Sequence, residues 1–434
     1  MLELLDLRTR RERLQPRRLE IDPSVADAVR DIIGRVRAEG DAALLDLTLR
    51  FDGPDLRERG LRVTPAEFER AEATVPIELK AAIDALVERL EELHRRQIPI
   101  EWIDEAGGVR SGEIVKPIRG AGCYVPGGRA VYPSSVAMTV VPAVVAGVEQ
   151  VVVCTPPSQD GSVHPSVLYA AVRAGANHVV KVGGAQAIAA MAFGTDSVPA
   201  VDKVVGPGNV YVTEAKRQLN GVVGIDGLAG PSELVLVADG TADATFVAAD
   251  LVAQAEHDPQ AEAVLVTTDA LLLDAVLEAL AAEVARAARR EIVEEALAHA
   301  RAVLVADLEQ AAQVVDDLAP EHLQLVLEDA RGFAVRVRSA GAIFLGRWSP
   351  VPFGDYGIAS NHVLPTSGSA RFSSGLRAAD FVTVTSVVEM DEAASVRLAP
   401  DVVEIARAEG LFGHARAVEI RAGRAAQPAE ELER

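Results

Sequence analysis

The sequence has few cysteines, no long apolar run and no excess of positive charge, and each absence excludes a class of protein. Cys123 and Cys154 are the only cysteines among 434 residues, which is too few for a disulfide framework and suits a reducing compartment. No run of about 18 uninterrupted apolar residues occurs, so the sequence predicts no membrane span. With 43 Lys and Arg against 64 Asp and Glu, the net charge is −21, which repels phosphate backbones and argues against nucleic acid as a partner.

The N-terminal segment shows no targeting signal. It begins Met1-Leu2-Glu3-Leu4-Leu5-Asp6, without a basic region followed by a long apolar stretch, so we expect no secretory leader. An arginine-rich stretch from Arg8 to Arg18 is interleaved with acidic and apolar residues, which favours a solvated or subunit-contacting segment. Together with the scarcity of cysteine, these features predict a cytoplasmic protein.

Length and composition predict a soluble globular protein with about two to four domains. Hydrophobic residues make up 49% of the chain and charged residues 25%, as in ordinary soluble proteins. Short apolar strands alternate with helical stretches, which indicates α/β architecture with parallel sheets. The predicted strands cover 151–154, 178–182, 201–205, 234–237, 263–267, 303–306, 322–327 and 342–345. The predicted helices cover 24–50, 66–95, 166–174, 187–193, 242–257, 270–299 and 308–318.

Glycine and proline divide this pattern into units. Pro99 and Pro117 bracket a strand-like stretch that leads into a glycine-rich turn from Gly120 to Gly128. The tripeptide Gly230-Pro231-Ser232 marks a boundary between two α/β units. After Pro365 the chain becomes loop-like, and a last helix leads to Gly410.

Gln254 and His257 are the first candidate metal ligands. They lie three residues apart at the end of a helical pattern, so they project from one face of a helix. Histidine nitrogen and carboxylate oxygen are ordinary zinc ligands, and the side-chain oxygen of glutamine is a weaker one. An ordinary hydrogen-bonded pair on a helix remains the alternative. Further nitrogen and oxygen donors follow at Asp355, His362, Glu409 and His414.

Glu321 and His322 are candidates for proton transfer. Pro320 ends the preceding helix, and the pair begins an apolar strand. Histidine titrates near a pKa of ~6.5 and therefore exchanges protons at neutral pH. Neighbouring strand residues point to opposite faces, so the two can serve one substrate only where the backbone bends. The alternative is a polar strand cap.

Two glycine-rich turns and one long loop are candidate ligand-binding segments. Residues 183–186 and 206–209 each follow a predicted strand, where backbone amides approach ligands closely. Neither turn matches GxGxxG, so they predict a nucleotide or small-molecule crevice without identifying a dinucleotide. The loop at 353–366 carries Asp, Asn and His, as functional loops often do, although a plain turn cluster would look the same.

Taken together, these motifs resemble the histidinol dehydrogenase family. They occur in the family's order and extend from about residue 25 to the last helix. Phe353 and residues 357–360 fill a part of the loop that varies, and the extreme termini match little. The matching segments are Cys123–Gly128, Val182–Ala189, Asp202–Asn209, Thr213–Arg217, Ala229–Glu233, Gln254–His257, Pro320–Leu323, the loop Gly354–Tyr356 with Asn361–Thr366, and Glu409–His414.

The resemblance implies two incomplete Rossmann-like parallel-sheet domains, one inserted in the other. Residues 20–122 and 233–372 would form the domain that carries the metal and acid/base residues, and residues 123–232 the inserted NAD-binding domain. Residues 1–19 and 373–400 would form a small dimerisation domain. Residues 401–434 would form a C-terminal segment that crosses to the partner's active site in a homodimer.

The resemblance also implies an activity, two cofactors and a set of site residues. The enzyme would convert L-histidinol through L-histidinal to L-histidine, the last steps of histidine biosynthesis, and would reduce two NAD⁺. Each subunit would bind one zinc ion. The implied zinc ligands are Gln254, His257, Asp355 and His414. The implied acid/base pair is Glu321 and His322. Besides these, substrate contacts fall on Ser232, His362 and Glu409, and NAD contacts fall on Tyr124, Gln186 and Asn209.

Three rival functions remain open at this point. Cys123 in a glycine-rich turn suggests a thiol nucleophile, as in an aldehyde-dehydrogenase-like enzyme, although no histidine lies near it in the sequence. A glutamate–histidine pair beside a metal also suits a zinc hydrolase. A non-catalytic small-molecule binding protein on a doubly wound scaffold is the third possibility.

Overall fold

The computed structural model of the protein describes residues 2–10, 13–127, 130–356 and 360–423. Its contacts divide the chain into two units. The first unit comprises Met1–Ile98 and Ile118–Phe381, and the second comprises Pro99–Pro117 and Val382–Arg434. The first unit contains two parallel sheets with helices on both faces, which confirms the predicted α/β class.

A six-stranded sheet, here sheet A, forms the first α/β body. All of its strands are parallel, in the order β1-β11-β10-β9-β12-β13. The strands are β1 (Glu3–Asp6), β9 (Glu233–Ala238), β10 (Glu262–Thr267), β11 (Arg301–Leu304), β12 (His322–Val326) and β13 (Ala342–Leu345). Its helices are α9 (Ala244–Ala255), α10 (Ala270–Arg286), α11 (Arg290–Leu297), α12 (Leu308–Leu318), α13 (Ala330–Ala334) and α14 (Val351–Tyr356).

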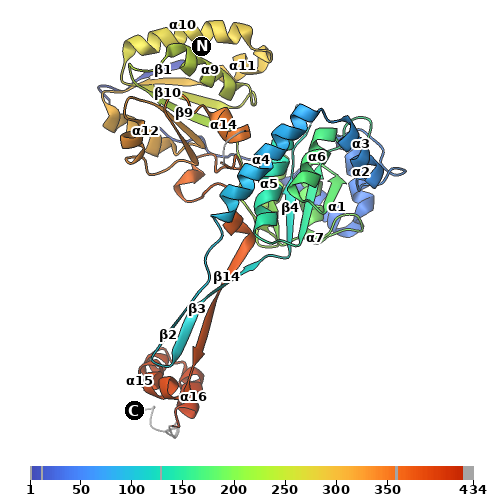
Figure 1. Ribbon diagram of the computed structural model, residues 1–434, viewed down its shortest axis with the longest axis vertical. Helices are drawn as coiled ribbons and strands as arrows, with labels where there is room; N and C mark the ends of the chain where they lie inside the picture. The colour runs from blue at the N-terminus through green and yellow to red at the C-terminus, as the bar shows by residue number, and fades with distance from the viewer. Residues whose placement is uncertain (1, 11–12, 128–129, 357–359, 424–434) are drawn as a thin grey trace. The chain divides into compact units, whose positions relative to one another are not determined.

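The two faces of sheet A pack against different helices. Leu234 and Leu236 of β9 pack with α9, α10 and α11, whereas Val235 and Val237 pack with α12 and α13 (Figure 1). Burial on both faces explains why these strands read as continuous apolar runs. Because β12 pairs with β9 in parallel, His322 lies beside Leu234 and faces the α9 side of the sheet.

A five-stranded sheet, here sheet B, forms the second α/β body. Its strands are parallel in the order β6-β5-β4-β7-β8. They are β4 (Gly120–Tyr124), β5 (Gln150–Thr155), β6 (His178–Lys181), β7 (Lys203–Val205) and β8 (Gly224–Ile225). The helices between them are α5 (Pro133–Val145), α6 (Pro165–Ala174), α7 (Gly184–Phe193) and α8 (Val210–Leu219). The 3-10 helices η1 (Ser369–Arg371) and η2 (Ala378–Phe381) follow sheet A in the chain.

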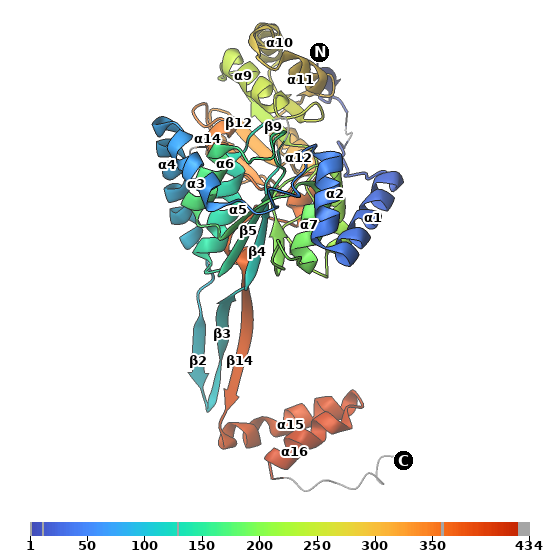
Figure 2. The same ribbon diagram turned by 90° about the vertical axis from the view of Figure 1, so that its right-hand side faces the viewer.

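Four N-terminal helices complete the two faces of sheet B. They are α1 (Pro23–Glu39), α2 (Asp41–Phe51), α3 (Pro65–Thr74) and α4 (Ile77–Arg95). The first two pack with α7 and α8, and the last two pack with α5 and α6 (Figure 2). Each pair was predicted as one long helix. The breaks fall at Gly40, whose φ is +57°, and at Pro76, because both residues interrupt a helical backbone.

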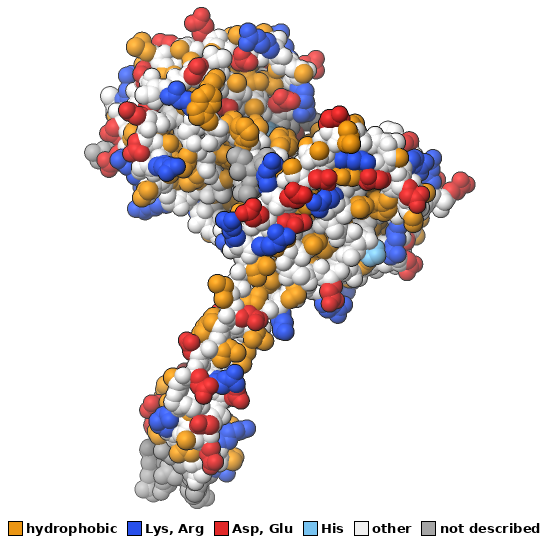
Figure 3. All heavy atoms as spheres, in the orientation of Figure 1, with side chains coloured by type: hydrophobic (Ala, Val, Ile, Leu, Met, Phe, Trp, Pro, Cys, Tyr) orange, Lys and Arg blue, Asp and Glu red, His pale blue; other side chains and the backbone are white. Residues whose placement is uncertain are grey.

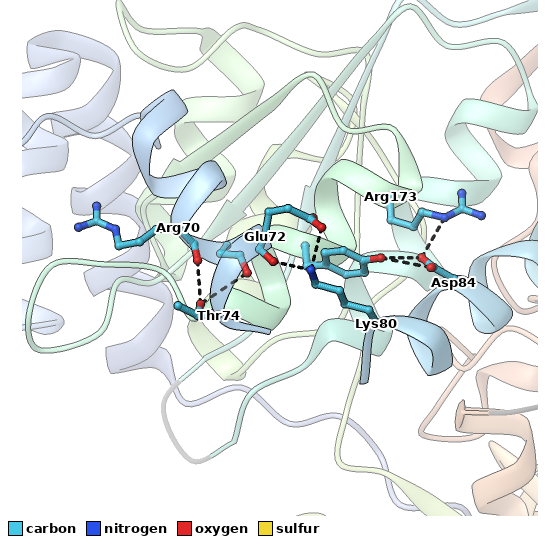
Figure 4. Close-up of polar contacts among 8 residues, drawn as sticks. Arg70, Glu72, Thr74, Lys80, Asp84 and Arg173 are labelled. Atoms are coloured by element: carbon cyan, nitrogen blue, oxygen red, sulfur yellow. Dashed lines mark hydrogen bonds and ion pairs between the residues drawn. The ribbon is translucent and has the colours of Figure 1, made fainter. Parts of the chain in front are cut away.

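Polar contacts also join α3, α4 and α6 at the surface. Figure 4 shows Arg173 of α6 beside Asp84 of α4, where Nε lies 3.0 Å from Oδ1. Lys80 of α4 pairs with Glu72 of α3, with Nζ 2.7 Å from Oε1. These groups are partly exposed, so the apolar core beneath them contributes more to the packing than the ion pairs do.

The second unit is a small sheet with two helices. Its strands β2 (Trp102–Ala106), β3 (Val109–Pro117) and β14 (Val382–Met390) are antiparallel in the order β14-β3-β2. The helices α15 (Glu392–Ala408) and α16 (Phe412–Arg421) pack on each other. Apolar side chains of the strands are exposed, as Figure 3 shows. They include Trp102, Ile103, Val384, Val388 and Met390.

The structure differs from the domain boundaries that the resemblance implies. Residues 99–117, expected in the domain 20–122, belong to the second unit, where β3 pairs with β14. β1 pairs with β11, so residues 3–6 belong to sheet A and not to a separate dimerisation domain. Residues 20–98 and 120–122 belong with sheet B, because α1 to α4 bury their apolar faces there. α15 crosses the boundary predicted at residue 400 and packs on α16. The nesting itself is correct, since sheet B lies between β1 and β9 in the chain.

The predicted glycine-rich turn at 120–128 is also partly wrong, because it begins as the buried central strand β4. A Cβ at position 122 would lie 2.5 Å from Met191 Sδ, so glycine here permits close packing of α7 on the strand. Gly128 of this motif, Arg11 and Glu12 of the arginine-rich stretch, and the tail beyond residue 423 lie outside the described residues. Within the described ranges, no helix is long and apolar enough to cross a membrane.

Candidate active site

The amino edge of sheet A gathers the predicted acid/base and metal-binding residues. Glu321 and Ser232 stand just before β12 and β9, which are neighbouring strands. The carboxylate oxygen Oε2 of Glu321 accepts hydrogen bonds from Ser232 Oγ and from the backbone N–H of Glu233, both at 2.8 Å. Gln254 Nε2 donates to the same Ser232 hydroxyl at 3.1 Å. A chain of hydrogen bonds therefore runs from α9 through Ser232 to Glu321.

His322 completes a buried acid/base pair with Glu321. Its Nδ1 lies 3.1 Å from the carbonyl oxygen of Glu233 and 3.4 Å from Glu321 Oε2. Both contacts involve Nδ1, which leaves Nε2 as the ring nitrogen for a substrate. The two side chains meet because Ala319, with a φ of +46°, and Pro320 end α12 and turn the chain before the strand begins. The backbone therefore bends before β12, as it must if Glu321 and His322 are to serve one substrate.

The pair is an ionised couple at neutral pH. Burial alone would raise the pKa of Glu321, but the adjacent His322 and the donated hydrogen bonds hold that pKa below its ordinary value. Burial would likewise lower the pKa of His322, but the charge and hydrogen bond of Glu321, with a contribution from Asp355, raise it to about 9. The pairing therefore favours a protonated His322 beside an ionised Glu321.

Three of the four predicted metal ligands line one small cavity. Gln254 and His257 come from the end of α9 and the residues after it, and Asp355 comes from α14. Asp355 is buried, whereas His257 is exposed. The cavity is lined by Leu234, Asp250, Ala253, Gln254, His257, Gln324, Val351, Pro352 and Asp355.

The donors in this cavity fit a metal ion. Because Gln254 uses its amide nitrogen on Ser232, its oxygen Oε1 is directed elsewhere, and it is buried without a hydrogen-bond partner among the described residues. An unpaired buried oxygen beside an imidazole and a carboxylate is a mixed nitrogen and oxygen donor set of the kind that zinc accepts. Within the described ranges, no group of three or more His, Cys, Asp or Glu side chains is placed to hold a metal.

His362 lies in the loop after α14, and sheet B helps to hold it. Its Nδ1 is 3.9 Å from Asp355 Oδ1, and its Nε2 is 3.3 Å from Ser135 Oγ on α5. Burial lowers the pKa of His362, so the ring is neutral at neutral pH. The preceding Asn361 donates to Met138 O at 2.7 Å and lies 3.3 Å from Nε2 of the buried His94. These contacts place the loop between α4 and α5.

The predicted NAD-binding residues gather at the carboxyl edge of sheet B. Tyr124 ends β4, and its hydroxyl accepts a hydrogen bond of 3.1 Å from the N–H of Gly184, at the start of α7. Gln186 is buried in the first turn of the same helix. Asn209 caps α8, with Oδ1 accepting from Tyr211 N at 3.0 Å and Val212 N at 3.2 Å. This edge, at helix N-termini, is where dinucleotides bind to doubly wound sheets.

A buried ion pair supports the turn that carries Asn209. Lys216 Nζ donates to the carbonyl oxygen of Gly206 at 2.5 Å and to Asp226 Oδ1 at 2.6 Å. Asp226 Oδ2 accepts from the N–H of Gly206 at 2.7 Å, so the pair binds both backbone polar groups of Gly206. Gly206 has a φ of +109°, and a Cβ there would lie 2.1 Å from Tyr124 O. Only glycine permits this approach.

Glu409 and His414 belong to the second unit, and the remaining site residues belong to the first. Glu409 follows α15, and His414 lies in the first turn of α16. Both side chains are exposed. Their assignment to a site with Gln254, His257 and Asp355 remains a prediction. Residues 357–359 of the variable loop lie outside the described residues.

The rival thiol mechanism finds no support in the structure. Cys123 lies within β4 and is fully buried. Burial raises the pKa of its thiol to about 12, so the nucleophilic thiolate does not form near neutral pH. Cys154 is equally buried on β5, and burial likewise raises its pKa.

Sequence reasoning overlooked Glu233, although its peptide group contacts both members of the acid/base pair. Its side-chain Oε1 accepts a hydrogen bond of 2.9 Å from the N–H of Ser367, whose φ of +55° is unusual for a residue other than glycine. Glu233 thereby ties the start of β9 to the loop that contains His362. Burial and the nearby charge of Glu321 raise the pKa of Glu233 to about 8.

We expect Glu233→Gln to stabilise the protein selectively at higher pH. Between its ordinary pKa of 4.5 and the folded value of about 8, the folded state holds a proton on Glu233 that the unfolded state has lost, so stability falls as pH rises. Glutamine is neutral and keeps the oxygen that accepts from Ser367. Urea unfolding should show similar stability at pH 5 and a gain of about 2–4 kcal/mol at pH 8.

The matched control is Glu309→Gln, which removes an exposed carboxylate on α12. Its stability should follow that of the unmodified protein at both pH values. A Glu233→Gln variant that loses as much stability as the unmodified protein between pH 5 and pH 8 would show that Glu233 is ionised in the fold.

Comparison with known proteins relates this arrangement to one family. The model of the histidinol dehydrogenase family matches residues 15–422. A histidinol dehydrogenase of Gluconobacter oxydans is 48% identical over 401 residues, which cover 92% of this chain and 93% of that protein. One of Synechococcus is 47% identical over 396 residues, which cover 91% of each.

A solved structure agrees with the sequence comparisons. The crystal structure of histidinol dehydrogenase from Elizabethkingia anophelis superposes with a TM-score of 0.94 and 35% identity, over 97% of this chain and 98% of that one. The match spans both sheets and the second unit, so it concerns the whole fold and not one domain. The chain belongs to the histidinol dehydrogenase family.

Proposed function

We propose that the protein oxidises L-histidinol through L-histidinal to L-histidine and reduces two NAD⁺ in doing so. The observation that carries the proposal is the buried pair of Glu321 and His322 beside a cavity that Gln254, His257 and Asp355 line. Family membership supports the substrate, since the relatives are named for it. The cysteine content and the soluble α/β fold favour the cytoplasm as the location.

The first half-reaction needs a base. Oxidation of the alcohol moves one hydride to NAD⁺ and releases one proton, and Nε2 of His322 is the acceptor that we assign to that proton. Because Glu321 keeps the ring protonated at rest, His322 must first release its own proton to solvent. Ser232 and the backbone of Glu233 hold the carboxylate of Glu321 in place throughout.

The second half-reaction needs a water molecule. We assign its activation to Glu321: the carboxylate takes a proton from the water while the water oxygen attacks the aldehyde carbon. The proton that His322 gained in the first half-reaction passes to the aldehyde oxygen, so that an aldehyde hydrate results and His322 is again free to accept a proton. The hydrate then gives its hydride to a second NAD⁺ and a proton to His322, which leaves the carboxylic acid. Holding the aldehyde between the two steps limits the escape of a reactive intermediate.

The cofactors occupy two places in this proposal. Zinc, held by Gln254, His257, Asp355 and His414, would anchor the amine and imidazole nitrogens of the substrate and would offset the charge of Asp355 beside His322. Tyr124, Gln186 and Asn209 would hold NAD⁺ at the carboxyl edge of sheet B. Ser232, His362 and Glu409 would contact the substrate.

We further infer a homodimer in which Glu409 of the partner subunit and His414 of the partner subunit complete each site. The apolar side chains exposed on the strands of the second unit support a subunit contact there. The three ligands in the cavity are one short of the four that zinc takes in most protein sites, which supports a ligand from elsewhere.

An assay with L-histidinol and NAD⁺ tests the proposed function. We expect two NADH for each histidine formed, loss of activity with a chelator and recovery with added zinc. One NADH per product would restrict the enzyme to a single oxidation. No NADH from histidinol, together with zinc-dependent hydrolysis of esters or amides, would favour the zinc hydrolase.

The roles of Glu321 and His322 can be separated with Glu321→Gln. If Glu321 activates water, this variant keeps slow oxidation of histidinol to histidinal but loses oxidation of supplied histidinal by about 10²–10⁴-fold. The measurement is NADH formation with each substrate separately. The exposed-site variant Glu309→Gln should leave both rates unchanged. Equal losses of the two rates would reject the assignment of the water-activating role.

Mixing two inactive variants tests the shared site. His257→Ala removes a ligand from the cavity, and His414→Ala removes the ligand that we assign to the partner. If the site is shared, a heterodimer of the two variants has one intact site, so equal mixing with subunit exchange should restore about a quarter of the activity. If each chain completes its own site, every site in the mixture lacks one ligand and no activity returns.

A further inference from the structure

Gln324 is a second buried amide in the cavity that the predicted metal ligands line. It lies on β12 two residues after His322, so both side chains face α9. Its exposure is 0%. It lies further along β12 than His322, next to the turn of α9 that precedes Gln254.

Asp250 fixes the orientation of this amide. Gln324 Nε2 donates to Asp250 Oδ2 at 2.6 Å, a short hydrogen bond to a carboxylate. A carboxylate accepts and does not donate, so the amide nitrogen must face Asp250 and the amide oxygen must point away from it. Asp250 stands one helical turn before Gln254, which places the residue that orients Gln324 on the helix that carries two of the metal ligands.

The oxygen of Gln324 has no hydrogen-bond partner within the described part of the chain, and it is buried. Gln254 Oε1 is likewise buried without a hydrogen-bond partner in the described part of the chain, and both residues line the same cavity. A buried acceptor without a donor destabilises a fold, so such atoms are uncommon unless a ligand, an ion or a water satisfies them. A metal ion would satisfy Gln254 Oε1. A donor is still needed for Gln324 Oε1.

We propose that Gln324 is a specificity-determining residue, whose side-chain oxygen accepts a hydrogen bond from an N–H or O–H group of the molecule bound in this cavity. The proposal rests on the proposed function, since it assigns the donor to the histidinol–zinc assembly. Two sources carry that donor: a nitrogen of the substrate, or a water molecule bound to the metal. Asp250 acts as the positioning residue that presents the acceptor.

The experiment compares ligand binding by the full-length protein and by Gln324→Met, which keeps the length and burial of the side chain but removes the acceptor. Zinc binding is measured alone against a competing chelator. Histidinol binding to the zinc-loaded protein is then measured by calorimetry without NAD⁺. A zinc affinity weakened by roughly 10-fold or more assigns the donor to metal-bound water, because partners of metal-bound groups have effects of this size. Unchanged zinc binding with histidinol binding weakened by roughly 10-fold or more assigns it to the substrate.

Two further variants separate this role from a structural one. Asp250→Asn keeps the amide of Gln324 but lets it turn over, because asparagine offers both a donor and an acceptor. Asp250→Asn should weaken binding of the same ligand as Gln324→Met does, but to a smaller extent. Gln310→Met removes a side chain of α12 that bonds to Leu7 O and Ala306 N, and it should lower stability without changing either ligand's binding.

Binding of zinc and histidinol by Gln324→Met with unmodified affinities would overturn the proposal, whatever its stability. If Gln324→Met does not fold, an Asp250→Asn protein with unmodified affinities would overturn it instead. Failure of the unmodified protein to bind zinc or to oxidise histidinol would reject the proposed function itself. If the unmodified protein does both and the variant binds both ligands equally well, only the role of Gln324 is rejected.

Discussion

One carboxylate oxygen, Glu321 Oε2, connects the parts of the candidate active site. It accepts hydrogen bonds from the hydroxyl of Ser232 and from the backbone N–H of Glu233, and it lies 3.4 Å from the ring nitrogen Nδ1 of His322. A buried charge is stable only with such partners, so the carboxylate requires β9 and β12 to begin side by side. Through Ser232 the same oxygen is coupled to Gln254, which lines the cavity of the proposed metal ligands and whose amide oxygen is buried without a partner among the described residues. The proton-transfer pair and the ligand set are therefore one hydrogen-bonded structure.

The two sheets offer opposite edges for the two halves of the proposed chemistry. Sheet B presents Tyr124, Gln186 and Asn209 at its carboxyl edge, where strand ends meet helix N-termini and favour a phosphate-bearing cofactor. Sheet A presents its acid/base pair at the amino edge, where α9 ends and the ligand side chains project. The loop after α14 joins them, because Asn361 is held by α4 and α5 while His362 lies beside Asp355. Family proteins that share this fold match it over nearly the full chain.

Much of the fold was predictable from periodicity, and the failures have physical causes. The strands of sheet A are apolar on both faces, so they could be located to within a few residues at 234–237, 263–267 and 322–327. β4 was not recognised, because three of the five residues in Gly120–Tyr124 are glycine or alanine, and small residues usually indicate a turn. β1 has four residues, too few for a periodicity, and its place beside β11 depends on a pairing across almost 300 residues.

The sequence by itself determined which residue types carry the chemistry, since the order of motifs from Cys123 to His414 identifies the family and names its candidate ligands and acid/base pair. Only the tertiary structure decided how those groups are charged and which others join them. The pKa of His322 rises because Glu321 turns toward it at the end of α12. Asp250 and Gln324 follow the helical and strand periods of Gln254 and His322, yet only packing of α9 on β12 brings them together. The spacing of residues along the sequence specifies which face of a helix or strand they share. Contacts between segments that are distant in the sequence specify which other element packs on that face.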